Sequence, residues 1–185
     1  MSSIDSSGRT WVFVPTSFRG CGVRPSRRTQ EVLVVNGVKK VDHIAIAVKS
    51  IAESRSWFES VYGARYLGQK ENVELLYIVA YFLMGESLIT MLEGTAPESF
   101  VTQHIERRGE GIQHMGVEVD DLDAFLANAE SLGARVSNQR TIEGIRKEAL
   151  ISPKSAFGII LQPIEWLGDL KSEPHHERII KAGGL

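Results

Sequence analysis

Two histidines and two neutral polar residues occupy corresponding places in apolar segments of the chain. His43 and His114 are 71 positions apart, and Thr90 and Gln162 are 72 positions apart. Each lies in a run of apolar, often β-branched residues that is typical of a β-strand. Because strand side chains alternate between two faces, we expect all four polar side chains to face one cleft.

A divalent metal ion is the chemistry that these four side chains suggest. Two imidazoles, with Gln162 and more weakly Thr90 as oxygen ligands, could hold zinc, cobalt, nickel, manganese or iron and leave positions open. Such a metal polarises substrate oxygens or binds O₂. One alternative is that the histidines are hydrogen-bonded cleft residues. Another is a metal-free enzyme in which His43 or His114 serves as acid or base.

Three further side chains are candidate catalytic groups. Glu118 has the same strand parity as His114, and Tyr77 and Tyr81 share one face of another strand. Glu118 could supply a carboxylate to the cleft, or it could close its strand and hold the start of the following helix. The two tyrosines could line the cleft or serve in ordinary sheet packing.

The remaining ionisable residues are expected to lie outside the cleft. Glu93 and Glu165 have the opposite parity to the two neutral polar residues, so they should point away. His104 is expected to be exposed on a linking helix. His175 and His176 lie in a polar segment near the C-terminus, which we expect to be solvated.

The chain contains an internal duplication, which is a strong signal of its architecture. The segment VDHIAIAVKSIAESRSWFESVYGARYLG begins at Val41, and the segment IQHMGVEVDDLDAFLANAESLGARVSN begins at Ile112. The two histidines are in phase, and the Gly-Ala-Arg sequence that begins at Gly63 recurs at Gly133. In each segment a strand pattern leads into an amphipathic helix that ends near the glycine.

The duplication predicts an α+β fold of two βαβββ modules. Ser50 and Asp121 are the expected N-caps of the two helices. Neither half has enough core alone, so we expect the modules to form a curved mixed sheet around a central cleft, with helices outside. The expected strands are 42–48, 65–70, 75–84, 87–93, 113–119, 134–138, 146–151 and 157–164, and the linking helix is 98–108.

Three regions follow from this organisation. The main domain is expected at residues 41–166, with modules at 41–94 and 112–166 and a link at 95–111. Residues 1–40 are expected to be an N-terminal extension that is partly disordered or adds strands near Trp11–Val14 and Glu31–Val35. Residues 167–185 are expected to be a C-terminal tail.

The composition is that of an ordinary globular protein. The formal net charge is −2, from 21 basic and 23 acidic residues, so we expect neither nucleic acid nor a membrane surface as a partner. Cys21 is the only cysteine, which excludes an intramolecular disulfide and fits a cytoplasmic location. The Arg- and Ser-rich residues 1–30 leave import into an organelle open.

The two histidine segments resemble a known superfamily. Asp42–Val48 and Gly111–Asp121 are similar to the histidine-bearing strands of the vicinal-oxygen-chelate superfamily, which includes glyoxalases, bleomycin-resistance proteins and dioxygenases. The turns Met84–Ser87 and Ser152–Lys154 also fall in register, and the resemblance covers residues 41–166. Members of the methylmalonyl-CoA epimerase type are the most similar, and Gly-Ile-Gln-His also resembles the hydroxyphenylpyruvate dioxygenase branch.

The resemblance implies a ligand set from which this chain departs. The epimerases bind metal through His, Gln or Glu, His, and Glu, and the corresponding residues here are His43, Thr90, His114 and Gln162. The carboxylate is missing from the fourth position. A carboxylate proposed as the base of the epimerases falls near Ile78, which cannot accept a proton.

The resemblance therefore implies several functions. The first is a metal-dependent isomerase, epimerase or lyase acting on a small carbonyl or acyl-CoA substrate, for which Arg107 and Arg108 could hold a phosphate. The alternatives are a metal-free binding protein of the bleomycin-resistance type and a dioxygenase of the same superfamily. A homodimer is the expected assembly, by analogy with members of the superfamily.

Overall fold

The computed structural model describes residues 2–4, 10–12 and 37–183. The chain divides into a small unit, residues 1–32, and a large unit, residues 33–185. In the small unit, strand β1 (Ser2–Ile4) pairs with β2 (Thr10–Val12) in antiparallel orientation. The strand expected at Trp11–Val14 overlaps β2, whereas the one expected at Glu31–Val35 lies outside the described residues.

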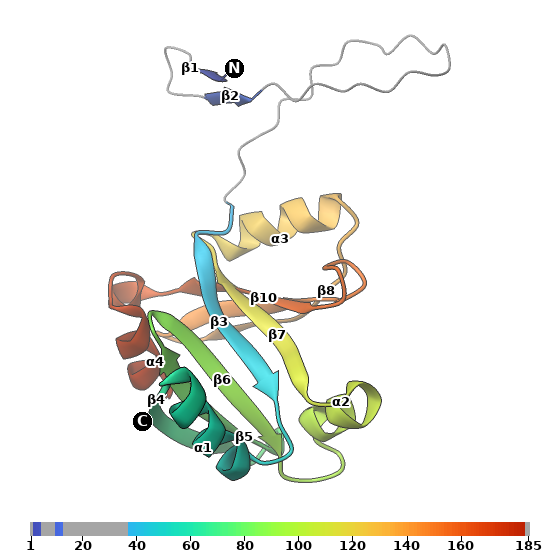
Figure 1. Ribbon diagram of the computed structural model, residues 1–185. Coiled ribbons are helices and arrows are strands. Elements are labelled where there is room, and N and C mark those ends of the chain that lie inside the picture. The colour runs from blue at the N-terminus through green and yellow to red at the C-terminus, as the bar shows by residue number, and fades with distance from the viewer. Residues whose placement is uncertain (1, 5–9, 13–36, 184–185) are drawn as a thin grey trace. The chain divides into compact units, whose positions relative to one another are not determined.

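The large unit is built on one open, mixed sheet of eight strands, as Figure 1 shows. Their order across the sheet is β4-β5-β6-β3-β7-β10-β9-β8. The strands are β3 (Lys40–Ala47), β4 (Arg65–Asn72), β5 (Tyr77–Met84), β6 (Ser87–Gly94), β7 (Gly111–Glu118), β8 (Val136–Ile142), β9 (Arg146–Ile151) and β10 (Ile160–Trp166).

The sheet order repeats itself about its centre. β3 and β7 pair in antiparallel orientation, β6 runs parallel to β3, and β10 runs parallel to β7. Each half contributes four strands, so the prediction of two βαβββ modules in one curved mixed sheet is confirmed. The main differences are that β8 extends to Ile142 and that β10 begins only at Ile160.

Helices α1 (Ile51–Tyr62) and α3 (Leu122–Ser131) occupy matching places in the two modules. Ser50 Oγ accepts a hydrogen bond from Glu53 N, and Asp121 Oδ1 accepts one from Ala124 N, so both predicted N-caps are present. Gly63 follows α1 with a φ of +63°, a left-handed conformation that glycine adopts without strain.

A glutamate from the sheet also supports the start of each of these two helices. Glu93 Oε2 accepts a 2.7 Å hydrogen bond from Ile51 N, and Glu165 Oε2 accepts a 3.0 Å bond from Leu122 N. A carboxylate at a helix N-terminus satisfies a free N–H group and complements the helix dipole. Both glutamates point away from the cleft, as their strand parity predicted.

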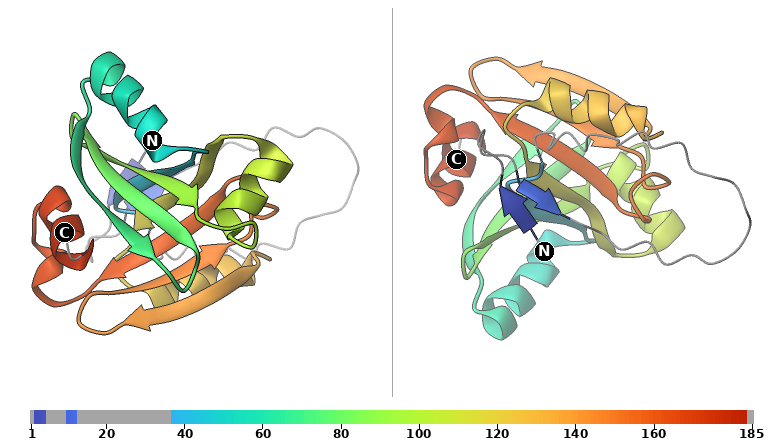
Figure 2. Two further views of the ribbon diagram at one scale, coloured as in Figure 1. Left: turned by 90° about the horizontal axis from the view of Figure 1, so that it is seen from below. Right: turned by 90° about the horizontal axis from the view of Figure 1, so that it is seen from above.

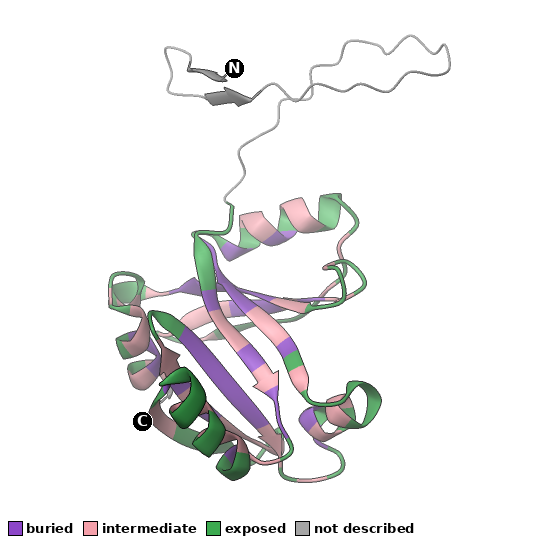
Figure 3. Ribbon diagram, in the orientation of Figure 1, coloured by how far each residue is buried: buried purple, intermediate pink, exposed green. Residues whose placement is uncertain are grey.

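The hydrophobic core lies mainly between the sheet and these two helices. The apolar cluster beneath α1 consists of Val48, Ile51, Ala64, Ala80, Phe82, Ile89 and Met91. The cluster beneath α3 consists of Val119, Leu122, Leu126 and Ala149. Figure 2 shows the helices on the outer sides of the curved sheet, and Figure 3 shows how deeply β6 is buried. Two smaller clusters lie on the side of the sheet that carries the cleft, namely Ala45, Ala47, Leu92 and Val101, and Leu88, Ile164, Trp166 and Ile179.

The link and the C-terminal region are also helical. α2 (Phe100–Arg108) joins the modules, as predicted. A 3₁₀ helix (Gly168–Lys171) and α4 (His175–Gly183) follow β10, where we expected a solvated tail. The polar composition was misleading because α4 buries Arg178 and Ile179 against the sheet. Within the described residues, no helix is long and apolar enough to cross a membrane.

Candidate functional site

His43 and His114 meet on the inner face of the sheet. They project from the central strands β3 and β7, where His43 pairs with Gly116 and His114 pairs with Ala45. The two Nε2 atoms are 3.0 Å apart, and the rings are edge to face with centroids separated by 5.1 Å. The pairing of β3 with β7 therefore brings together two histidines that are 71 positions apart in the sequence.

The residue directly before each histidine lies in a β-bulge. The register of β3 against β7 shifts between Val41 and His43, and again between Ala45 and Ile46. In the first shift Asp42 is left unpaired, and in the second Gln113 is left unpaired. Because a bulge redirects side chains, each of these residues can reach the neighbouring histidine. Simple strand alternation would have placed them on the opposite face.

The two bulged residues determine which nitrogen of each imidazole carries the hydrogen. His43 Nδ1 lies 2.8 Å from Asp42 Oδ1, and His114 Nδ1 contacts Gln113 Oε1. A carboxylate or amide oxygen only accepts, so both Nδ1 atoms are donors. In the neutral rings both Nε2 atoms then carry lone pairs, and these face each other. A hydrogen bond from one ring nitrogen to an oxygen is the usual way to orient a histidine whose other nitrogen binds a metal.

Asp42 is itself held by groups from the C-terminal part of the chain. Trp166 Nε1 donates a 2.8 Å hydrogen bond to Asp42 Oδ2, and His175 Nε2 lies 3.3 Å from the same oxygen. Burial alone would raise the pKa of Asp42, but its interactions with His175 and His43 outweigh burial and lower the pKa well below its usual range. Asp42 is therefore a buried carboxylate anion behind His43.

Burial and nearby positive charge keep His114 neutral. Burial, followed by the charges of His43 and Arg146, lowers the pKa of His114 to about 3, while its interaction with Gln162 acts in the opposite direction. A neutral imidazole with a free Nε2 lone pair is the form that binds a metal.

Thr90 and Gln162 complete the set that the sequence predicted. Both are buried, and both line the same cavity as the two histidines. Gln162 Nε2 donates to Glu148 Oε2 at 3.1 Å, whereas its buried Oε1 has no hydrogen-bond partner in the part of the chain that the structure describes. A buried oxygen without a partner is costly unless a ligand satisfies it.

These donor atoms fit a divalent metal held by nitrogen and neutral oxygen. Two nitrogens bound at about 2.1 Å and at a right angle are about 3.0 Å apart, which is the separation of the two Nε2 atoms. Gln162 Oε1 offers a third donor. Across residues 2–4, 10–12 and 37–183, no group of three or more His, Cys, Asp or Glu side chains could share a metal.

The cavity around the site has two chambers. One has a volume of about 530 Å³ and is lined by the four predicted ligands together with Tyr77 and Tyr81. The other has a volume of about 850 Å³ and is lined partly by α2. Tyr77, Arg140, His114 and Gln162 line both chambers, so these side chains lie where the two meet.

Glu148 and its two arginines are functional-site residues that the sequence analysis missed. Arg140 Nε and Arg146 Nε each donate a 2.6 Å hydrogen bond to the buried Glu148 carboxylate. Burial would raise the pKa of Glu148, but the charges of Arg146 and Arg140 outweigh it and lower the pKa below its usual value. Arg146 and Glu148 share one face of β9, a spacing that could have revealed the pair.

Among the candidate catalytic groups, the structure brings only the tyrosines to the cavity. Burial raises the pKa of Tyr77 and of Tyr81, so both are neutral hydroxyls at physiological pH. Glu118 is buried elsewhere, where Arg178 Nη1 donates a 2.6 Å hydrogen bond to its Oε2. Glu118 therefore neither supplies a carboxylate to the histidines nor caps α3, a role that Asp121 has.

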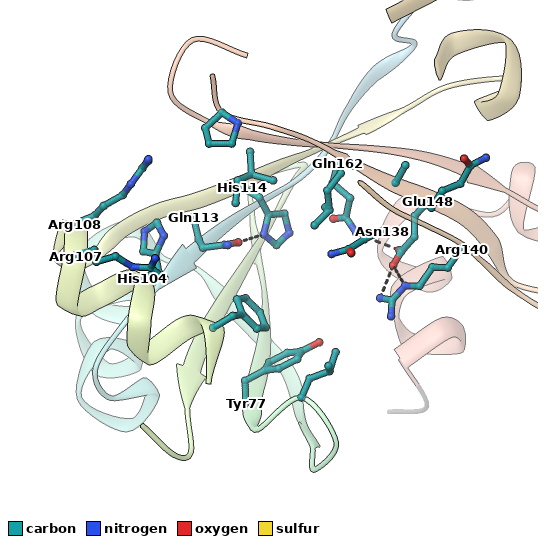
Figure 4. A pocket seen from close by; sticks show the side chains of 17 residues that line it. Tyr77, His104, Arg107, Arg108, Gln113, His114, Asn138, Arg140, Glu148 and Gln162 are labelled. Atoms are coloured by element: carbon teal, nitrogen blue, oxygen red, sulfur yellow. Dashed lines mark hydrogen bonds and ion pairs between the residues drawn. The ribbon is translucent and has the colours of Figure 1, made fainter. Parts of the chain in front are cut away.

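The larger chamber has a basic side formed by α2. His104, Arg107 and Arg108 line it, although we expected His104 to face solvent. In Figure 4 these residues lie on one side of His114, and Glu148 and Arg140 lie on the other. Arg108 Nη1 donates to Gly158 O at 3.1 Å, which ties α2 to the loop between β9 and β10.

The fold and the histidine pair define a class of protein, and comparison with known families gives the same answer. Residues 40–153 match the family described as the Glyoxalase/Bleomycin resistance protein/Dioxygenase superfamily. The chain belongs to this superfamily.

Two individual proteins show which members of the superfamily the chain is similar to. Uncharacterized protein YqjC of Bacillus subtilis (strain 168) is 30% identical over 146 residues, covering 74% of this chain and 99% of that protein. The mitochondrial methylmalonyl-CoA epimerase of Mus musculus is 22% identical over 141 residues, covering 75% of this chain and 79% of the epimerase.

A solved structure has the same fold. The methylmalonyl-CoA epimerase from Mycobacterium tuberculosis superposes with a TM-score of 0.65 at 23% identity, covering 77% of this chain and 98% of the epimerase chain. The similarity extends over nearly the whole epimerase, and so it includes both modules.

Proposed function

We propose that this protein is a metal-dependent enzyme of the isomerase, epimerase or lyase type that acts on a small carbonyl or acyl-CoA substrate. One observation carries the proposal. Hydrogen bonds from the two Nδ1 atoms to Asp42 and Gln113 direct the two Nε2 lone pairs toward each other at 3.0 Å. Gln162 Oε1, which has no hydrogen-bond partner among the described residues, lines the same chamber. When both rings are neutral, lone pairs in this arrangement repel each other unless a metal ion lies among them or one Nε2 takes up a proton and donates it to the other.

His43, His114 and Gln162 would hold the metal, and Thr90 would be a weak fourth ligand or a substrate contact. When bound, the metal would polarise the oxygens of the substrate. All of these ligands are neutral, so the positive charge of the metal would remain available to a developing oxyanion. Tyr77 and Tyr81, as neutral hydroxyls facing the same chamber, would donate hydrogen bonds to substrate oxygens.

An epimerisation also needs a group that accepts a proton from the substrate carbon. Glu148 is a carboxylate near the cleft, but two arginines occupy both of its oxygens and lower its pKa. A carboxylate so stabilised is a weak base. We therefore propose that Glu148 orients Gln162, through the 3.1 Å hydrogen bond, and does not itself take a proton.

Metal content tests the proposal directly. Protein purified without added metal, and then incubated with zinc, cobalt, nickel, manganese or iron and dialysed, should retain about one ion per chain. His43→Ala and His114→Ala should lose it. His104→Ala is the matched control, because His104 lines the larger chamber without touching the histidine pair, and it should retain the ion. Wild-type protein that takes up none of the five metals contradicts the proposal.

Exchange of an acidic substrate proton tests the reaction class. With methylmalonyl-CoA in D₂O, an epimerase replaces the hydrogen next to the thioester by deuterium, and NMR follows the loss of its signal. We expect the metal-loaded wild type to accelerate this exchange and His114→Ala to abolish the acceleration. A protein that binds metal but does not promote exchange would exclude epimerisation of this substrate and leave other carbonyl substrates to test.

A metal-free binding protein is the second candidate. The observation that favours it is that, in the described part of the chain, no carboxylate joins the two histidines in a group that could share a metal, and a carboxylate would strengthen divalent metal binding. A cavity chamber of about 850 Å³ is also large enough for a drug-sized ligand. The dioxygenase alternative is weakened by the same feature, because its usual set is two histidines and one carboxylate.

The expected homodimer and cytoplasmic location remain predictions. The outer face of α1 supports an assembly contact, because Trp57, Val61 and Tyr62 are each at least half exposed there. Apolar groups gathered on one helix are common at protein interfaces.

A further inference from the structure

The inner face of module two carries an excess positive charge. Arg140 and Arg146 share the single carboxylate of Glu148, which leaves one positive charge uncompensated within this group. Glu148 is buried, and the Arg146 side chain is only 23% exposed. The Arg140 side chain is 54% exposed, so water screens its charge, whereas the more enclosed Arg146 is the guanidinium that gains most from an added opposite charge.

The hydrogen bonds within this group leave donors unused. Arg140 directs both Nε and Nη2 to Glu148 Oε1, whereas Arg146 directs only Nε to Oε2. The two Nη atoms of Arg146 make no hydrogen bond to any residue that the structure describes. Glu148 cannot serve them, because its Oε2 also accepts from Gln162. A guanidinium presents two parallel N–H groups that match a carboxylate, and one such edge remains available here.

The two arginines lie beside the proposed metal ligands. Arg140 and Arg146 line the 530 Å³ chamber together with His43, His114 and Gln162. The carbon of the Arg146 guanidinium is 5.5 Å from the centroid of the Trp166 ring, which supports one face of the group. The charge of Arg146 also reaches His114, Tyr77 and Tyr81 strongly enough to act on the pKa of each.

We infer that Arg146, assisted by Arg140, binds a carboxylate of the substrate beside the histidine pair. The inference rests on the proposed function and narrows its substrate class to small oxygen-bearing acids. Such a substrate would present its carboxylate to the guanidinium, while its reacting oxygens face His43 and His114. The anion would neutralise the excess charge of the group, which a neutral substrate of the same shape could not do.

Malonate and its neutral diamide, malonamide, are probes of equal size that differ in charge. Calorimetric titration of the whole protein, in the metal-free form and after loading with cobalt, should show binding of malonate and at least about 10-fold weaker binding of malonamide. Arg146→Gln should weaken malonate binding by about 10-fold or more and leave malonamide binding unchanged. Arg146→Lys keeps the charge but not the paired donors, so its affinity for malonate should lie between those of the wild type and Arg146→Gln.

Arg55→Gln is the matched control, because Arg55 lies on α1 and pairs with Glu59. It should bind malonate like the wild type. Circular dichroism and thermal unfolding would establish that Arg146→Gln is folded, which is expected because Arg140 remains on Glu148. If a folded Arg146→Gln protein binds malonate with wild-type affinity, or if malonamide binds as tightly as malonate, the inference is wrong.

The test separates this inference from the proposed metal site. If cobalt binds but Arg146→Gln does not alter malonate binding, the inference fails and the metal site stands. If cobalt does not bind but the metal-free protein binds malonate through Arg146, the metal-dependent function fails and the carboxylate site stands.

Discussion

The two modules share one scaffold but differ in the charges that they bring to the cleft. Each supplies a histidine on a central strand, a bulged residue that contacts its Nδ1, and a helix supported by a glutamate from the sheet. The bulged residue is the anion Asp42 in module one and the neutral Gln113 in module two. Duplication has thus preserved backbone geometry, while electrostatics have diverged.

A second difference lies further along the central strands. Glu118 in module two corresponds to Ala47 in module one, at the same offset of 71 as the histidines. Ala47 is buried and apolar, whereas Glu118 receives Arg178 from α4. Only module two therefore has a carboxylate at this position for Arg178 of the C-terminal helix, and this helix in turn places His175 near Asp42 of module one. The asymmetry lets one module support the histidine of the other.

Removing the Arg178 anchor should have the largest effect. Arg178→Met leaves Glu118 as a buried charge without its closest partner, which should lower the free energy of unfolding by about 3 kcal/mol. Urea denaturation followed by circular dichroism measures this change. Lys181→Met is the control, because Lys181 lies on the same helix in an exposed ion pair, and it should lower the free energy of unfolding far less than Arg178→Met does. Equal effects of the two changes would contradict an anchoring role for Arg178.

Filling the space at Gly116 should disrupt the histidine pair from module two. A Cβ atom there would lie 2.5 Å from Nδ1 and from Cε1 of His43, so the ring would have to move. We expect Gly116→Ala to weaken cobalt binding by about 100-fold, as large changes around a metal site do. Competition with a chromogenic chelator measures the affinity.

The corresponding position in module one is Ala45, which already carries a Cβ opposite His114. Ala45→Gly should therefore leave cobalt affinity within about 3-fold of the wild type, even if it costs about 1 kcal/mol of stability. Wild-type affinity in Gly116→Ala would show that the His43 ring position is unimportant for metal binding.

Changing the charge of the residue that contacts Nδ1 of each histidine should have a smaller effect on cobalt affinity. It tests whether the charge difference between the two modules matters for the metal site. Asp42→Asn removes the negative charge behind His43 and should weaken cobalt binding by about 10-fold. Gln113→Glu adds a charge behind His114 and should strengthen binding by a similar factor. The same chelator competition applies. If neither change alters affinity, the outer contacts do not tune the site.

Much of the fold could be predicted because the sequence repeats itself. Periodicity and duplication gave the order of elements, both helix caps, and the outward direction of Glu93 and Glu165. Strand parity also placed His43, His114, Thr90 and Gln162 around one cavity. The ligand roles of these four residues remain predictions that the metal measurements test.

The missed features depend on contacts between distant segments. Asp42 and Gln113 reach the histidines only because two bulges interrupt strand alternation. No local residue pattern predicts those bulges. The polar sequence of α4 predicts a solvated tail, because nothing local indicates that Arg178 is buried against Glu118, 60 positions earlier. Arg140 likewise stands directly opposite Glu148 only because the pairing of β8 with β9 shifts between Ser137 and Arg140.

The sequence by itself determined the duplicated scaffold and the residue types available for chemistry. Both can be recognised from local sequence periodicity, because all strands share one backbone geometry and all helices share another. Only the tertiary structure decided how those residues are held and charged. Hydrogen-bond direction, burial and excess charge at His43, His114 and Arg146 arise from atoms that the fold brings together from distant parts of the chain.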